Sequence, residues 1–130
     1  MAKGGKEATK VKIGKVLQYG AILIEVRDAE KCQAYESAKS PPGAALLVVG
    51  LKLENTKNQS CAYIVPDEEI WLSHKEGELS KPENYRFETA LDPKKPSEGH
   101  AWFVVPAEAK KFSLFFGKKT LPKMCVDFEF

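Results

Sequence analysis

Apolar and polar residues alternate with a period of two along most of this chain. Ile22, Ile24 and Val26 fall on one side of such a segment, and Glu25 and Arg27 fall on the other. This alternation is typical of a half-buried β-strand. Similar segments, separated by turn residues, predict about eight short strands. The nine candidate segments are residues 11–18, 19–29, 44–54, 61–66, 68–77, 85–91, 99–106, 112–117 and 123–130.

The segment 46–60 changes its pattern along its length. Residues 46–49 are apolar on both sides, whereas from Gly50 onward only the side of Leu51 and Leu53 is apolar. This predicts a central strand of which one end is covered on both faces. The polar residues 55–60 that follow predict a turn, with Asn55 as a structural corner.

Helical patterns are scarce. The candidates are residues 29–38, as a short helix or an irregular crossover, and one turn within residues 106–111. Pro41 and Pro42 would end the first of these. Many short strands with turn signals between them predict an all-β fold, a β-sandwich of about 7–9 antiparallel strands with at most one short helix.

The length of 130 residues fits a single domain with its own core. We expect a flexible basic segment over residues 1–10 and one β-sandwich domain over residues 11–130. Residues 1–15 carry five Lys against one Glu, so the net charge of +2 conceals a basic N-terminus.

No apolar run approaches the length of a membrane-spanning helix. With only two Arg in the chain, nucleic acid is an unfavoured partner.

The residues able to carry catalysis or hold a metal are few and dispersed. Three Cys cannot all pair in disulfides, and His74 and His100 lack the paired spacing of a zinc site. A thiol- or metal-dependent enzyme that uses Cys61 with His74 or His100 stays open as an alternative function. The position of Cys61 at the start of an apolar strand favours a packed, inert thiol instead. We therefore expect no cofactor, no metal and no catalytic residue.

Aromatic residues offer candidates for a recognition surface. Tyr35, Trp71, Tyr85 and Trp102 are residue types that anchor ligands and partners, although large aromatic side chains also fill cores. We expect a site on the loops within 28–43 or 75–98, which are long enough to carry one. A second alternative is a binder of anionic partners that uses the Lys-rich ends of the chain.

Three segments resemble parts of a known family. The strand "AALLVVGLKLEN" (44–55), with its final Asn55, resembles the central strand of a family of bacterial extracytoplasmic domains of unknown function. The segment 91–116 is similar to the second signature of the family, in which a Leu-x-Pro turn leads to Gly99 and then to a strand that ends in Phe-x-x-Pro. The segment "IWLSHKEG" also resembles a strand and turn of the family. Lys94 occupies the place, directly after the Leu-x-Pro turn, where the family usually has Gly.

The resemblance implies an immunoglobulin-like sandwich similar to mycobacterial immunoprotective secreted antigens and lipoprotein domains. It implies a non-enzymatic module that is secreted or lipid-anchored, and that binds another protein or a cell-envelope component or supports an envelope assembly. The cytoplasm is the expected location instead if Met1 is the native start. An exposed strand edge can pair with another chain, so we expect either a monomer or a homodimer.

Overall fold

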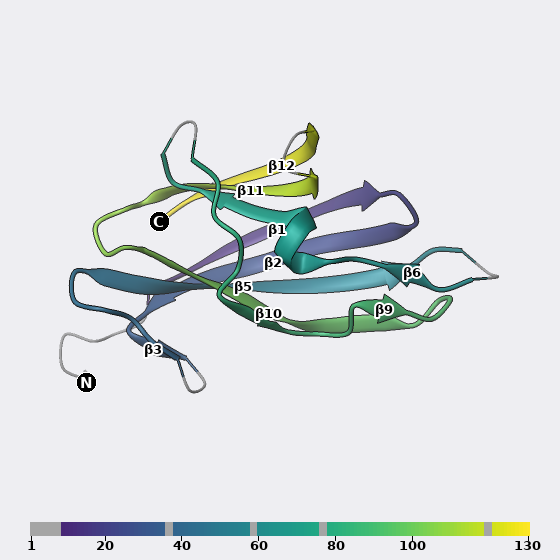
Figure 1. Cartoon of the computed structure of the whole chain (residues 1–130), viewed down its shortest axis with the longest axis horizontal. Helices are drawn as coiled ribbons and strands as arrows, with labels where there is room; N and C mark the ends of the chain where they lie inside the picture. Colours follow the sequence, from purple (N-terminus) through teal and green to yellow (C-terminus); the bar gives the residue numbers. More distant parts are fainter. Residues whose placement is uncertain (1–8, 36–37, 58–59, 76–77, 119–120) are drawn as a thin grey trace.

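The computed structural model describes residues 9–35, 38–57, 60–75, 78–118 and 121–130. The strands of the first sheet are β1 (Thr9–Tyr19), β2 (Ile22–Cys32), β5 (Ala44–Asn55), β10 (Pro96–Pro106) and β8 (Asn84–Arg86), in that spatial order. The second sheet contains β12 (Leu121–Glu129), β11 (Lys111–Lys118) and β7 (Ile70–Ser73). Neighbouring strands are antiparallel throughout both sheets. In Figure 1, β11 and β12 lie above β1 and β2 in the view.

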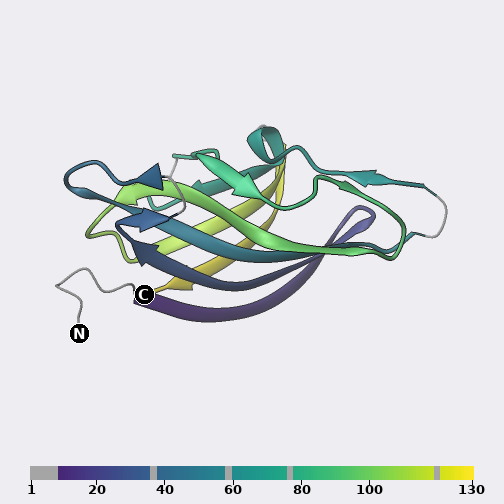
Figure 2. The same cartoon turned by 90° about the horizontal axis from the view of Figure 1, so that it is seen from below.

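The topology is that of an immunoglobulin-like sandwich with one additional strand. Without β1, the order β2-β5-β10-β8 opposite β12-β11-β7 is the same as the order of strands A-B-E-D opposite G-F-C in a constant-type immunoglobulin domain. β1 extends the first sheet beyond β2 and is its edge strand in Figure 2. The predicted all-β sandwich is therefore confirmed, with eight strands in its two main sheets.

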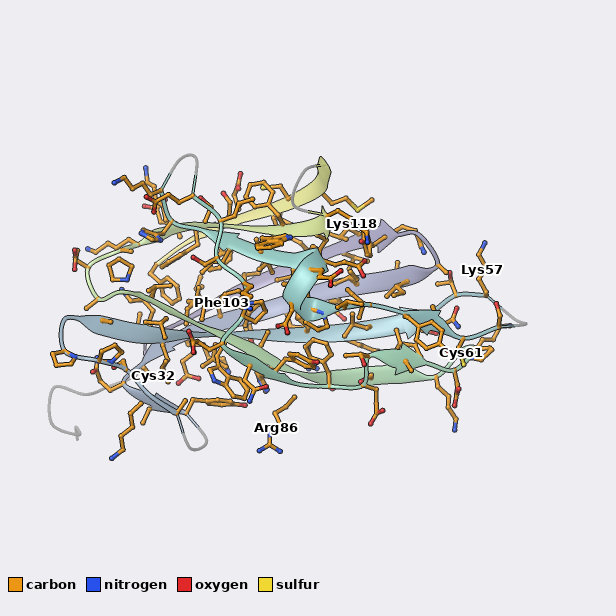
Figure 3. The ribbon with its side chains drawn as sticks, viewed as in Figure 1. Cys32, Lys57, Cys61, Arg86, Phe103 and Lys118 are labelled. Carbon is orange, nitrogen blue, oxygen red and sulfur yellow. The ribbon has the colours of Figure 1, made fainter. Side chains whose placement is uncertain are left out.

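The core lies between the two sheets and follows the period-two pattern. The inward-facing side chains of β5, including Leu47, Leu51 and Leu53, are fully buried together with Phe103 of β10 and Phe116 of β11. Figure 3 shows Phe103 near the centre of the molecule. This alternation explains why the sequence pattern located the main strands.

Neither helix candidate forms a helix in the described residues. β2 continues to Cys32, because the backbone of residues 28–32 pairs with residues 46–50 of β5. The two short strands β3 (Ala34–Tyr35) and β4 (Ala38–Lys39) then form a small antiparallel ladder. Residues 106–109 form a hydrogen-bonded turn between β10 and β11. Strand pairing provides hydrogen-bond partners for the backbone of these residues, as a helix would have done. The weak helical pattern therefore does not lead to a helix here.

The one helix among the described residues is α1 (Pro66–Glu69), immediately before β7. Pro66 occupies its first turn, where the missing N–H costs nothing. The remaining strands, β6 (Ala62–Tyr63) and β9 (Ala90–Leu91), pair with each other. None of the described helical residues forms a segment long and apolar enough to cross a membrane.

Asn55 closes the end of β5 as a buried corner. Its side-chain amide donates to the carbonyl oxygens of Ser60 (2.7 Å) and Leu91 (3.0 Å), and its Oδ1 accepts from the N–H of Lys57 (2.9 Å). Its own carbonyl accepts from the N–H of Lys94 (2.9 Å). The side chain is fully buried and tied to both flanking segments. The prediction of a structural corner at Asn55 is confirmed.

Candidate functional site

The outer face of the five-stranded sheet carries a polar depression beside β3. Its volume is about 530 Å³, within the range of small-ligand sites. We call it the Tyr35 depression, and the residues that line it come from β2, β3, β5, β8 and β10: Arg27, Asp28, Tyr35, Gly50, Arg86, Glu98, Gly99 and His100.

Tyr35 forms the wall of the depression and covers part of the sheet. Its ring meets Trp102 edge-on at 5.0 Å between centroids, and its hydroxyl shares a hydrogen bond of 3.1 Å with Nδ1 of His100. Leu46, Val48 and Trp102 point away from the main core, yet each is at most 3% exposed. The β3 segment therefore covers the end of β5 that the sequence predicted to be apolar on both faces.

Two glycines form the floor. A Cβ on Gly50 would lie 2.5 Å from Oδ1 of Asp28 and 3.6 Å from Cδ2 of His100. A Cβ on Gly99 would collide with the backbone carbonyl of Arg86. The absence of side chains at both positions lets Asp28 lie over β5 and lets β8 approach β10 closely.

Charges of both signs surround this floor. Arg27 Nη1 forms an ion pair with Glu98 Oε1 at 2.7 Å, and Lys10 Nζ lies 3.6 Å from Asp28 Oδ2. Arg27 and Arg86, the only arginines of the chain, lie at the same depression. Figure 3 shows Arg86 pointing away from the body of the sheet. An arrangement of guanidinium, carboxylate, imidazole and phenol groups suits recognition of a polar ligand that carries charge.

The structure brings together only two of the four predicted aromatic residues. Tyr35 and Trp102 are in contact, but Trp102 is 3% exposed and supports Tyr35 from beneath. Tyr85 packs against the main core and lies 5.2 Å from the ring of Phe87. Trp71 lies on the other sheet, where its Nε1 donates to the carbonyl oxygens of Glu68 and Gly117, each at 3.1 Å.

The charged residues of the depression were not selected from the sequence. Asp28 and Tyr35 come from the predicted site segment 28–43. Arg86 and Glu98 come from the other predicted site segment, 75–98. The sequence feature that could have indicated these residues is that the chain contains only two arginines. Arg27 and Arg86 are distant in the chain, and only the pairing of β2 with β5, β5 with β10 and β10 with β8 brings them to one face.

The described residues do not assemble the thiol–histidine pair of the alternative enzyme hypothesis. Cys61 Sγ donates to Asp92 Oδ1 at 3.3 Å, whereas His100 pairs with Tyr35 and His74 borders a hollow on the other sheet. The hydrogen bond to Asp92, followed by burial, raises the pKa of the Cys61 thiol. A raised pKa is the opposite of what an activated nucleophile needs. Among the described residues, no group of three or more His, Cys, Asp or Glu side chains is placed to hold a metal.

All three cysteines are free, and two of them are exposed. Cys61 and Cys125 are accessible to solvent and Cys32 is half-buried, so the expectation of a packed thiol at Cys61 is wrong. Figure 3 places Cys32 and Cys61 near opposite ends of the molecule. Cys61 is exposed because it precedes the two-residue strand β6 at the periphery, where it cannot reach the core.

The Lys-rich N-terminus lies largely outside the described residues, because β1 begins at Thr9. Lys10, the first lysine in the described part, is engaged with Asp28 at the edge of the Tyr35 depression. Lys31, near the C-terminal end of β2, donates to the carbonyl oxygens of Ala107 (2.6 Å) and Ala109 (2.7 Å). Both lysines therefore have partners within the sandwich.

Comparisons with known proteins relate this chain to uncharacterised bacterial proteins. No protein-family model and no curated protein matches the sequence. A conserved hypothetical protein from Bacillus anthracis superimposes with a TM-score of 0.72 at 11% identity, over 94% of this chain and 97% of that protein. An uncharacterised β-sandwich protein from Clostridium difficile 630 matches with a TM-score of 0.63 at 14% identity, over 99% and 98% of the two chains.

A third similar structure belongs to a larger protein. It is a Bacillus subtilis protein described as a "putative lipoprotein", with a TM-score of 0.60 and 15% identity. The match covers 88% of this chain but only 38% of that protein. At these identities the likeness shows the fold alone. The chain shares the β-sandwich fold of uncharacterised bacterial proteins, one of which is described as a "putative lipoprotein".

Proposed function

We propose that this domain is a non-enzymatic binding module that works outside the cytoplasm, and that the Tyr35 depression recognises a charged segment of a protein partner in the cell envelope. The observation that carries the proposal is the convergence of Arg27, Arg86, Tyr35 and His100 on one recessed face. Tyr and Arg are the residue types that dominate the energetics of protein interfaces.

The charge arrangement supports a partner that is itself a polypeptide. The Arg27–Glu98 ion pair is exposed, with side chains 46% and 55% accessible. Exposed pairs of this kind contribute little, about 0–1 kcal/mol, so a partner can replace one member at small cost. A protein segment with both acidic and basic side chains would complement Arg86 and Asp28 at the same time.

The surroundings of the cysteines support the non-enzymatic part of the proposal. The carboxylate of Asp92 disfavours a thiolate at Cys61, and Asp127 does the same for Cys125. The extracytoplasmic location is supported by the lipoprotein description of the Bacillus subtilis neighbour. Because residues 44–55 and 91–116 resemble signatures of the family, we further propose that this domain is related to mycobacterial secreted antigens.

Co-sedimentation of the purified domain with the envelope fraction of the source bacterium tests the binding role. We expect the wild type to sediment with envelopes, and we expect Tyr35→Ala and Arg86→Glu each to weaken this at least about tenfold, equivalent to about 1.4 kcal/mol. Val16→Ser is the matched control, because Val16 is 59% exposed on β1 and lies outside the depression. Digesting the envelope proteins beforehand should abolish sedimentation. Sedimentation that survives digestion, or that is equal for all variants, would contradict the proposal.

The location has a separate test. The chain expressed from its native gene should be degraded by a protease added to intact cells after removal of the cell wall. Complete protection until the membrane is lysed would overturn the extracytoplasmic part and leave the binding test unaffected.

A further inference from the structure

A second hollow lies on the outer face of the three-stranded sheet, away from the Tyr35 depression. Its volume is about 860 Å³, and it is bordered by β11, β12, the end of β7 with the residues after it, and Leu79. This volume is within the range that small ligands occupy in proteins. Neither Trp71 nor any residue of the Tyr35 depression lines it.

One side of this hollow is a row of hydrogen-bonding groups. Ser113 of β11 pairs in register with Ser73 of β7 on one side and with Asp127 of β12 on the other. Since neighbouring strands lie about 4.8 Å apart, the three side chains form a line roughly 10 Å long across the sheet. The register thus places two hydroxyls and a carboxylate side by side.

Asp127 is held as an acceptor in this row. Its Oδ1 accepts from Ser113 Oγ at 2.6 Å and from Cys125 Sγ at 3.2 Å. These two hydrogen bonds lower the pKa of Asp127 and keep it ionised at neutral pH. Oδ2 accepts no hydrogen bond from any residue in the described part of the chain. An ionised carboxylate is acceptor-only, so Oδ2 requires donors from a ligand or from water.

Apolar surface lies directly beside the polar row. Phe115 follows Ser113 by two residues, so its ring emerges on the same face about 7 Å further along β11. Leu79 borders the hollow from the segment that follows β7. The hollow therefore offers an aromatic ring next to a line of acceptors and hydroxyls.

We infer that this hollow binds a neutral saccharide, with one ring face on Phe115 and hydroxyl groups on Asp127, Ser113 and Ser73. A sugar ring combines an apolar C–H face with hydroxyls that both donate and accept. A purely apolar ligand would leave Oδ2 of Asp127 without a donor, which is costly when this carboxylate is desolvated. The lining carries Lys75 and Lys111 as well as Asp127 and Glu129, so it favours neither an anion nor a cation.

Saturation-transfer NMR with glucose, N-acetylglucosamine, maltotriose and chitotriose as probes tests this inference. We expect saturable binding of at least one probe, with transfer strongest at the ring C–H protons of the sugar that faces Phe115. Phe115→Ala and Asp127→Asn should each weaken binding at least tenfold. Asp127→Asn keeps an oxygen that can accept from Ser113, so this variant separates the loss of the charge from the loss of the fold.

Tyr35→Ala is the matched control and should bind the saccharide like the wild type. This control also separates the inference from the proposed function, whose variants lie on the other sheet. The thermal unfolding midpoint of each variant verifies that it is folded. If the folded wild type binds none of the four probes, or if Phe115→Ala and Asp127→Asn bind them as tightly as the wild type does, the inference is wrong.

Discussion

The hydroxyl of Tyr19 donates a hydrogen bond to the carboxylate of Glu69, which lies 50 positions later in the chain. Tyr19 ends β1 at the edge of the five-stranded sheet, and Glu69 ends α1 immediately before β7 of the other sheet. The second oxygen of Glu69 accepts from the N–H of Val65 at 3.0 Å. One carboxylate thus holds the start of α1 and the edge of the opposite sheet together.

Replacing Tyr19 by Phe should therefore destabilise the domain. The phenyl ring remains, but Glu69 loses a charge-assisted hydrogen bond, which costs about 1.5 kcal/mol. Urea denaturation at neutral pH measures this change in the free energy of unfolding. An unchanged midpoint would show that water replaces the hydroxyl without loss.

The same pair predicts an alkaline pH dependence. Burial, followed by the hydrogen bond and negative charge of Glu69, raises the pKa of Tyr19 well above its usual value of 10.0. Below pH 10 the phenol is protonated in both the folded and the unfolded state. Above it the unfolded chain releases the proton first, so stability falls as the pH rises. Between pH 9.5 and 11, the free energy of unfolding should decline less steeply in Tyr19→Phe than in the wild type.

Asn55→Ala should be among the most destabilising substitutions of a polar residue. It leaves the carbonyls of Ser60 and Leu91 without their donor in a buried corner, and we expect a loss of about 3 kcal/mol in the free energy of unfolding. Lys57→Ala is the control, since Lys57 is exposed and contributes its backbone N–H to the corner. Equal stability of the two variants would refute the role of Asn55.

Lys94→Gly should stabilise the domain by about 1 kcal/mol, since a side chain in the left-handed region costs about that much. Lys94 has a φ of 62°, the only positive value among the described residues other than glycine. It follows Pro93 in a turn closed by the hydrogen bond from Lys95 N–H to the carbonyl of Asp92 (3.2 Å). Proline followed by a residue with positive φ is the pattern of a type II turn, which prefers glycine at the second position. Lys95→Gly should give no such gain in urea denaturation.

The two glycines under the Tyr35 depression should respond differently to Ala. A Cβ on Gly99 meets the backbone carbonyl of Arg86, so Gly99→Ala must push β8 away from β10. A Cβ on Gly50 meets mainly the carboxylate of Asp28, a side chain that can rotate. We expect Gly99→Ala to cost at least about 3 kcal/mol and Gly50→Ala about 1 kcal/mol or less. Thermal and urea unfolding of the two variants, compared directly, measure the difference.

Cys125 should react slowly with alkylating reagents although it is exposed. Burial of the sulfur, followed by the hydrogen bond to Asp127, raises the pKa of the Cys125 thiol to about 11, so little thiolate is present at pH 8.5. Asp127→Asn removes the nearby charge and should accelerate iodoacetamide labelling of Cys125 several-fold. Peptide mapping by mass spectrometry distinguishes this site from Cys61, whose rate should stay the same.

The sequence by itself determined where the main strands lie and, where the alternation is clean, which side of a strand faces the core. The period-two pattern depends on the pleat of a single strand, so it can be read without knowledge of any partner. Residues 46–49, at the start of β5, are apolar on both sides of the strand, and this indicated that both faces are covered there. The signature ending in Asn55 marked a corner, because a buried amide at a strand end needs local partners.

Only the tertiary structure decided what covers that end and where charged groups meet. Tyr35 reaches Trp102 and His100 through the short β3–β4 ladder, in and around a segment whose pattern had suggested a helix. Arg27 and Arg86 share one face because of the order and register of four strands. Strand order and register are set by packing between segments distant in the chain, and no local periodicity records them.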